Sequence, residues 1–248
     1  MQISHSTSSL QGKRPSMQDT FTVIENLSGY FFAGIYDGHG GSNSAKFAAS
    51  KLHGLLVLNL KKHKPLEALS KTFVDLDKEI HQLKYDDGTT ASVVLIKDSK
   101  LYLAHVGDSR VIIKQGEKIS QLTKDHKITD PKELASYRSS NWFNTTSRLI
   151  SKGKIKKFSL ISISRSLGDR AFADAISPLP DVKELNIEGS EIIVMATDGV
   201  WDVIENQEIF AILDNATNKL SIANLLTKEA TKRGSADNVT AICINLEN

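Results

Sequence analysis

The sequence predicts an α+β fold of antiparallel sheets and paired helices. The pattern of residues 91–122 indicates four short strands. The turns between them are expected at 98–100, near 107–108 and at 115–117. Turns this short join antiparallel neighbours, because parallel strands need a longer crossover. Helix pairs are predicted before and after this meander, so we expect sheets and helices in layers.

The first helix pair is indicated by apolar side chains at helical spacing. Residues 42–62 carry Ala45, Ala48, Ala49, Leu52, Leu55 and Leu56 on one face. Residues 65–83 begin at a proline, which is tolerated in a first turn, and carry Leu69, Phe73, Leu76 and Ile80. A second pair is predicted at 206–213 and 220–233. Between the pairs, residues 127–157 are polar and irregular, with Pro131 opening a short helix.

Three apolar runs each stop at an aspartate. They are predicted strands at 31–36, 101–107 and 191–197, which lead into Asp37, Asp108 and Asp198. A fourth acid, Asp237, comes just before the closing strand at 238–246. Carboxylates at strand ends can gather at one edge of a sheet, where they repel each other. A hard divalent cation is the simplest way to keep them all ionised.

Each acid also has a simpler interpretation. The Asp-Gly pairs at 37–38 and 198–199 are typical of tight turns, and Asp108 and Asp237 could cap local backbone. The joint occurrence of four acids at strand ends favours a shared site. Oxygen ligands without a cysteine partner favour Mg²⁺ or Mn²⁺ over zinc or copper.

Composition excludes several classes of protein. The 248 residues include 31 basic and 29 acidic side chains, for a net charge of +2, which does not indicate a nucleic-acid binder. A lone Cys243 cannot form an intrachain disulfide or a thiolate-rich zinc site. Residues 1–18 lack the apolar stretch of a secretory signal, and no run is long enough to span a bilayer. We expect a monomer in the cytoplasm, with the nucleus as an alternative.

Eight short segments share one further property, which is their order along the chain. They are Arg14–Asp19, Tyr36–Gly41, Asp87–Ala91, Gly107–Arg110, Asp125–His126, Ser164–Asp169, Thr197–Asp202 and Ser235–Thr240. This ordered set resembles the metal-dependent protein serine/threonine phosphatases of the PPM (type 2C) family. The resemblance covers about Gln11 to Leu246 and is weak only over 127–163.

The resemblance implies a four-layer α-β-β-α sandwich of two antiparallel sheets flanked by helix pairs. It implies one catalytic domain over 1–248, with a variable flap-like segment at about 127–163 that influences substrate choice. Two Mn²⁺ or Mg²⁺ ions, with a weaker third, would lie at one end of the sandwich. A water activated between two ions would then hydrolyse phosphoserine or phosphothreonine without a covalent phosphoenzyme.

Residue by residue, the resemblance implies a ligand set. Asp37 would bridge the two ions and the Gly38 carbonyl would complete the second site. Asp198 and Asp237 would hold the first ion, and Asp108 with Asp198 would form the weaker third site.

Other residues would act around these ligands. Arg14 would hold the substrate phosphate with its planar fork, and His39 would protonate the leaving alkoxide. Gln18, Asp19 and Asn238 would support the ligands from behind. Many members carry Glu where this chain has Gln18, so one negative charge is missing there.

Several interpretations stay open beside this one. Phosphorylated proteins are the expected partners, with no nucleic acid and no membrane. The rival functions are a pseudophosphatase scaffold on the same fold and a phosphoesterase for small molecules, although scaffolds tend to lose the metal acids and Arg14. Arg165 and Asp169 are interpreted as a structural ion pair, and the basic cluster Lys152–Lys157 as a solvated loop.

Overall fold

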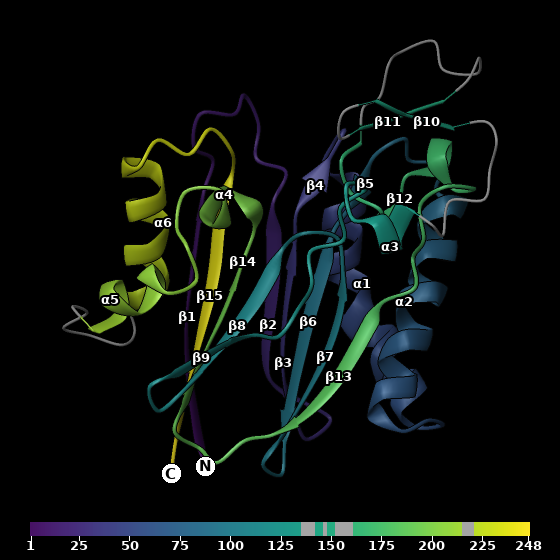
Figure 1. The fold of residues 1–248 in the computed structure, drawn as a ribbon. Helices are drawn as coiled ribbons and strands as arrows, with labels where there is room; N and C mark the ends of the chain where they lie inside the picture. Colours follow the sequence, from purple (N-terminus) through teal and green to yellow (C-terminus); the bar gives the residue numbers. More distant parts are fainter. Residues whose placement is uncertain (135–141, 146–147, 152–160, 215–220) are drawn as a thin grey trace.

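Two five-stranded antiparallel sheets form the centre of the molecule (Figure 1). The computed structural model describes residues 1–134, 142–145, 148–151, 161–214 and 221–248. Sheet A has the order β1 (Gln2–Leu10), β15 (Val239–Glu247), β14 (Glu191–Ala196), β8 (Arg110–Gln115) and β9 (Lys118–Gln121). Sheet B has the order β13 (Asp181–Asn186), β7 (Lys100–Val106), β6 (Ala91–Lys97), β3 (Tyr30–Tyr36) and β2 (Thr20–Leu27).

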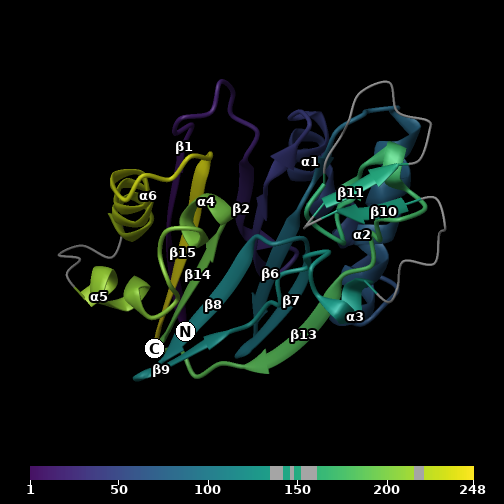
Figure 2. The ribbon, with the colours of Figure 1, turned by 45° about the horizontal axis from the view of Figure 1, so that its top comes forward.

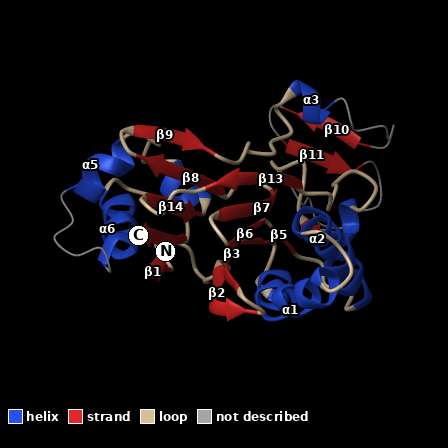
Figure 3. Cartoon of the chain, turned by 90° about the horizontal axis from the view of Figure 1, so that it is seen from below, coloured by secondary structure: helices blue, strands red, loops and turns tan. Residues whose placement is uncertain are grey.

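Helices cover the outer faces of both sheets. Helices α1 (Asn43–Leu60) and α2 (Pro65–Gln82) lie on sheet B, while α4 (Asp198–Trp201), α5 (Glu208–Asp214) and α6 (Ile222–Lys232) lie on sheet A. One apolar core fills the space between the sheets, and one lies under each helical layer. The end-on view shows the resulting four layers (Figure 3). The four-layer prediction is confirmed, and the predicted helices match to within a few residues.

Smaller elements gather at the end of the sandwich where α4 begins (Figures 1 and 2). Three two-residue strands form a small sheet in the order β12 (Leu167–Gly168), β5 (Gly88–Thr89) and β4 (Gly38–His39). The 3₁₀ turn η1 (Arg170–Phe172) follows β12. A hairpin of β10 (Trp142–Thr145) and β11 (Arg148–Ser151) lies nearby.

The turn near Gly107 was predicted wrongly. The other two short turns join hydrogen-bonded neighbours, but β7 belongs to sheet B and β8 to sheet A. The chain therefore crosses between the sheets at 107–109. Gly107 permits the crossing because its φ is +97°, and because a Cβ there would lie 2.5 Å from the Thr90 side chain.

Strands β1, β2 and β13 were not predicted. The Ser/Thr-rich β1 hides little apolar surface and instead bonds to α6, where the Ser6 hydroxyl accepts the Ala223 N–H at 3.2 Å and Ser8 contacts Thr227 at 2.7 Å. Strand β13 is an exposed polar edge, so its sequence lacks the apolar pattern of a buried strand.

Only part of the flap-like segment falls in the described ranges. The short helix predicted at Pro131 is present as α3 (Pro131–Leu134). The basic cluster Lys152–Lys157 lies outside the described residues. Within the described part of the chain, no helix is long and apolar enough to cross a membrane.

Candidate active site

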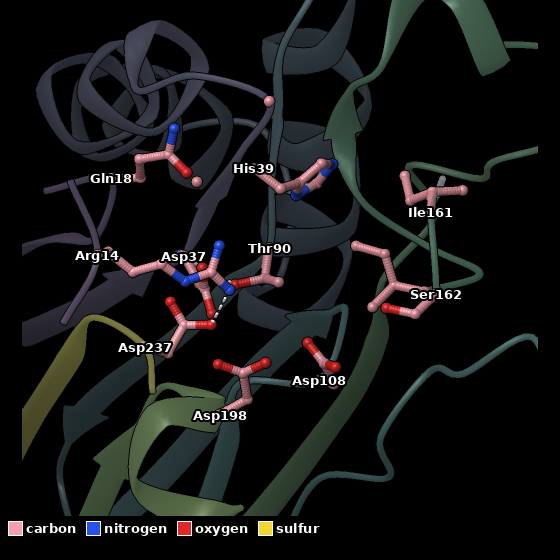
Figure 4. Close-up of a pocket in the computed structure, with 13 residues that line it drawn as sticks. Arg14, Gln18, Asp37, His39, Thr90, Asp108, Ile161, Ser162, Asp198 and Asp237 are labelled. Carbon is pink, nitrogen blue, oxygen red and sulfur yellow. Dashed lines mark hydrogen bonds and ion pairs between the residues drawn. The ribbon is translucent and has the colours of Figure 1, made fainter. Parts of the chain in front are cut away.

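A cavity of about 300 Å³ opens at the end of the sandwich where α4 begins, between the two sheets (Figure 4). All four strand-end acids line it. The described residues that line it are Arg14, Gln18, Asp37, Gly38, His39, Gly40, Thr90, Asp108, Ile161, Ser162, Ile163, Asp198 and Asp237. The predicted gathering of acids, Arg14 and His39 around one space is therefore present in the structure.

Each sheet contributes two of the acids. Asp37 follows β3 and Asp108 follows β7, so both leave sheet B. Asp198 is the first residue of α4 after β14, and Asp237 lies two residues before β15, so both belong to sheet A. Thr90 ties the two sheet B loops together, because its hydroxyl accepts the Asp37 N–H at 3.1 Å and contacts the Ser109 hydroxyl at 2.7 Å.

Burial, with repulsion from neighbouring carboxylates added to it, raises the pKa values of several of these acids. Burial, followed by repulsion from Asp108 and Asp237, raises the pKa of Asp198 to about 7. Burial and then Asp19 raise the pKa of Asp37 well above its ordinary range, and the pKa of Asp19 itself is raised to about 6, mainly by burial. These groups would ionise more readily if a cation were shared among them.

The donor set fits a hard divalent cation. All the acidic groups offer oxygen atoms, and the buried Oδ1 of Asp198 has no hydrogen-bond partner within the described part of the chain. The fit is not that of a preformed cage. Across the described ranges, no three His, Cys, Asp or Glu side chains already converge as a ligand group.

Two protein cations contact the acids. The Arg14 guanidinium donates to Asp237 at 2.5 Å, and the Lys127 ammonium lies 3.7 Å from Asp108. The Arg14 side chain is 52% exposed, so it can reach a ligand in the cavity. Sequence reasoning missed Lys127, because its position carries no signal for a contact with the loop after β7.

Asn238 holds the loop that carries Arg14. Its side-chain nitrogen donates to the carbonyls of Gln11 at 2.7 Å and Ser16 at 3.0 Å, while its oxygen accepts the Gln18 N–H at 2.8 Å. The predicted supporting residue therefore lies next to Asp237 and acts on the Arg14 loop.

Gln18 and Asp19 make different contacts near Asp37. With its amide turned so that both ends are satisfied, Gln18 donates to the Gly38 carbonyl and accepts from the Gly41 N–H, each at 3.2 Å. Asp19 is buried outside the cavity lining and accepts the Thr197 hydroxyl at 2.9 Å. Gln18 thus contacts the carbonyl that the resemblance assigns to a metal ion.

The proposed Arg165–Asp169 ion pair is wrong. Arg165 instead pairs with Glu133 and Asp181, each at 2.8 Å. The buried Asp169 carboxylate contacts Nε2 of His39 at 2.7 Å. Burial alone would lower the pKa of the His39 imidazole, but the Asp169 carboxylate outweighs burial and raises it.

Known proteins share this architecture. The chain superposes on the crystal structure of the serine-threonine phosphatase 2C from Toxoplasma gondii with a TM-score of 0.83 and 20% identity, over 99% of this chain and 95% of that one. A C. elegans sex determining protein gives a TM-score of 0.86 at 23% identity, over 97% of this chain and 64% of that one. These likenesses support the fold alone.

Sequence comparison reaches further. Probable protein phosphatase 2C 59 of Oryza sativa subsp. japonica is 31% identical over 98% of this chain and 75% of its own length. Probable protein phosphatase 2C 71 of Arabidopsis thaliana is 31% identical over 98% of this chain but only 55% of its own length. The family model described as Protein phosphatase 2C matches residues 3–239.

The chain belongs to the protein phosphatase 2C family. As a family member it is an enzyme, a protein serine/threonine phosphatase of the metal-dependent class. The phosphatase spans a little over half the length of some relatives and three quarters of others, so their full activities do not transfer to it automatically.

Proposed function

We propose that this phosphatase hydrolyses phosphoserine and phosphothreonine in proteins by direct attack of water, at a site holding two Mn²⁺ or Mg²⁺ ions and a weaker third. The observation that carries the proposal is the gathering of four strand-end acids around one cavity, with a buried Asp198 oxygen left without a donor in the described residues. When bound, the ions would lower the pKa of a water molecule and offset charge on the phosphoryl oxygens.

The acids would divide between the ions. Burial and then the charges of Asp19, Asp198, Asp108 and Asp237 raise the pKa of Asp37, so this carboxylate has the other acids around it. We therefore propose that Asp37 would be shared by two ions, and that the Gly38 carbonyl would complete the second site. Asp198 and Asp237 approach from sheet A and would share the first ion. Asp108 lies toward Lys127 and, with Asp198, would take the weaker third.

Arg14 is poised to exchange one partner for another. In the structure its guanidinium neutralises Asp237. A metal ion held by Asp237 would compete with this contact, and the guanidinium would then be free to form paired hydrogen bonds with a phosphoryl group. Its exposed position on the loop held by Asn238 suits this exchange.

His39 is the proposed general acid. An alkoxide leaves slowly without a proton, and an imidazole at the cavity can supply one near neutral pH. A thiol nucleophile plays no part, because Cys243 is buried in β15 and burial raises the pKa of its thiol far above neutrality.

The retained acids argue against the scaffold alternative, since a pseudophosphatase has no need for mutually repelling carboxylates. Phosphorylated proteins are the proposed partners, with a monomer as the working state. The cytoplasmic location stays a prediction, and one rice relative of 33% identity is named as mitochondrial.

Metal removal tests the proposal. Hydrolysis of a phosphoserine peptide should stop in excess chelator and return when Mn²⁺ is added. The control is the free energy of unfolding in chelator, which distinguishes loss of the ion from loss of the fold. Undiminished turnover in excess chelator would exclude the metal mechanism.

A further inference from the structure

The small sheet β12-β5-β4 brings one carboxylate to the proposed general acid. Gly88 in β5 is the register partner of His39 in β4 on one side and of Gly168 in β12 on the other. Asp169 follows Gly168 directly, and its N–H donates to the Asp87 carbonyl at 3.2 Å. Segments from three distant parts of the sequence therefore meet at Gly88.

The missing side chain of Gly88 makes room for a contact. A Cβ at this position would lie 2.3–2.6 Å from the carboxyl atoms of Asp169, so the carboxylate occupies the space that any other residue would fill. Across that space, Asp169 Oδ2 reaches Nε2 of His39 at 2.7 Å. Gly88 does not have a positive φ, so the requirement for glycine here is one of space.

The Asp169 carboxylate is itself held in place. It is 4% exposed, and the Ser166 hydroxyl donates to the same Oδ2. Asp169 has a left-handed φ of 48°, a conformation that Asp and Asn tolerate better than most residues. The backbone therefore accepts some local cost and directs a buried carboxylate at the histidine.

We propose that Asp169 is the positioning residue for His39, and that it selects Nδ1 as the nitrogen that delivers the proton. Nε2 stays protonated because it donates to Asp169, so only Nδ1 remains for the substrate. When the bond between phosphorus and the serine oxygen breaks, the oxygen keeps the electron pair and takes the proton from Nδ1. This role rests on the proposed role of His39 as the general acid.

The test compares two leaving groups. Asp169→Asn keeps the size of the side chain and its tolerance of a left-handed φ, but removes the charge. Its kcat on a phosphoserine peptide should fall about 10- to 100-fold with little change in KM. Its kcat on p-nitrophenyl phosphate should change less than about 3-fold, because that leaving group needs no proton.

A double-mutant cycle separates positioning from general damage. In a His39→Ala background, Asp169→Asn should cause no further loss on the peptide, since the group that it positions is gone. Gly88→Ala should reproduce the Asp169→Asn pattern from the opposite strand. Controls are Asp86→Asn, whose carboxylate is 82% exposed and pairs with Arg170, and Gly54→Ala, which meets nothing within 4 Å.

Two failures can be told apart. If His39→Ala slows both substrates equally, the general-acid proposal fails and the role of Asp169 falls with it. If His39→Ala shows the leaving-group pattern but Asp169→Asn adds its full loss to it, only the positioning role is overturned. Should Asp169→Asn unfold, the Gly88→Ala and Ser166→Ala variants decide by the same cycle.

Discussion

Two charged clusters meet at the loop that carries Asp108, and they are built in opposite ways. In the cavity, the carboxylates face each other, and burial together with neighbouring carboxylates raises the pKa values of Asp37, Asp108 and Asp198. Beside the cavity, Arg165 pairs with Glu133 and Asp181, and Asp181 also accepts from His126 at 3.1 Å.

The second cluster braces the first. Nδ1 of His126 accepts the Gly107 N–H at 3.2 Å, directly before Asp108. In the bracing cluster, the His126 hydrogen bond and then Arg165 hold the pKa of Asp181 well below its usual range. Glu133 and Asp108 are both 7% exposed, but hydrogen bonds from Arg165 and Ser164 lower the pKa of Glu133 against the effect of burial, whereas the pKa of Asp108 is raised. At equal burial, charge partners therefore distinguish a structural acid from a functional one. A buried acid that lacks a partner indicates a ligand that is still to come.

The largest effect on activity is expected from a substitution that disrupts the cavity cluster. Asp37→Asn removes the central charge while keeping the side-chain shape, so kcat on a phosphoserine peptide should fall at least about 100-fold. The Thr90 contacts to the Asp37 backbone should preserve the fold. Asp75→Asn, whose carboxylate is 29% exposed and lies 3.5 Å from the Lys71 ammonium on α2, is the matched control. A kcat near that of the parent protein would mean that the turn after β3 is only structural.

The next largest effect is expected from a substitution in the bracing cluster, which consists of Arg165, Glu133, Asp181 and His126. Arg165→Ala leaves Glu133, with a side chain 8% exposed, without its guanidinium, and the free energy of unfolding should drop by about 2 kcal/mol. Arg170→Ala is the control, since its partner Asp86 is exposed and the loss should stay below about 0.5 kcal/mol. Chemical denaturation at pH 7 measures both.

The loss of stability in Arg165→Ala should depend on pH, because the partners of Arg165 are carboxylates. The pKa values of Asp181 and Glu133 are lowered in the folded state, so their stabilising effect is present above their unfolded values near 4 and is lost as the pH falls. The difference between Arg165→Ala and the parent protein should therefore shrink in acid. A constant difference down to pH 3 would contradict the pairing.

The helices and the gathering of acids could be predicted because they depend on local patterns. Apolar spacing defined α1 and α2, and aspartates after apolar runs marked the cavity. Partners from distant segments leave no such pattern. Asp87 accepts the N–H groups of Asn43 and Ser44 at the start of α1, 44 and 43 residues away, and the Asp169–His39 contact spans 130.

The crossing at Gly107 illustrates the same limit. A short turn with glycine and aspartate is normally a hairpin, and nothing local distinguishes it from a change of sheet. The positive φ of Gly107 and the close approach of Thr90 show why glycine is needed at the crossing, and both are visible only in the folded chain. The single-domain interpretation and the individual metal ligands likewise stay predictions that need experiment.

A smaller effect is expected on the free energy of unfolding when the charge of Asp198 is removed. Removing the charge of a paired acid destabilises a protein, whereas removing this one should stabilise it. The pKa of Asp198 in the folded protein is about 7, above its unfolded value near 4, so ionisation costs stability as the pH rises through this range. In chelator at pH 8, Asp198→Asn should be more stable than the parent protein by about 1 kcal/mol. At pH 5 the difference should nearly vanish.

Adding metal should make the parent protein more stable than Asp198→Asn. Excess Mn²⁺ stabilises a folded protein that binds it, so the parent protein should then melt at the higher temperature. Thermal unfolding with chelator and with Mn²⁺ gives both comparisons in one series. A variant less stable than the parent protein at pH 8 in chelator would show that the Asp198 charge has a partner after all.

The smallest expected effect is that of a substitution at Gln18, at the edge of the cavity. Gln18 donates to the Gly38 carbonyl, which a glutamate cannot do when ionised. Gln18→Glu therefore sets a carboxylate against that carbonyl oxygen in the metal-free protein, and a bound cation relieves the repulsion. The Mn²⁺ concentration for half-maximal activity should fall a few-fold, which corresponds to about 1 kcal/mol of binding free energy, with little change in saturated kcat.

Ser16→Glu, at an exposed position of the same loop, is the control for a general effect of added negative charge. An equal shift in both variants would assign the change to net charge, whereas an unchanged or higher metal requirement in Gln18→Glu would mean that this side chain only braces the turn.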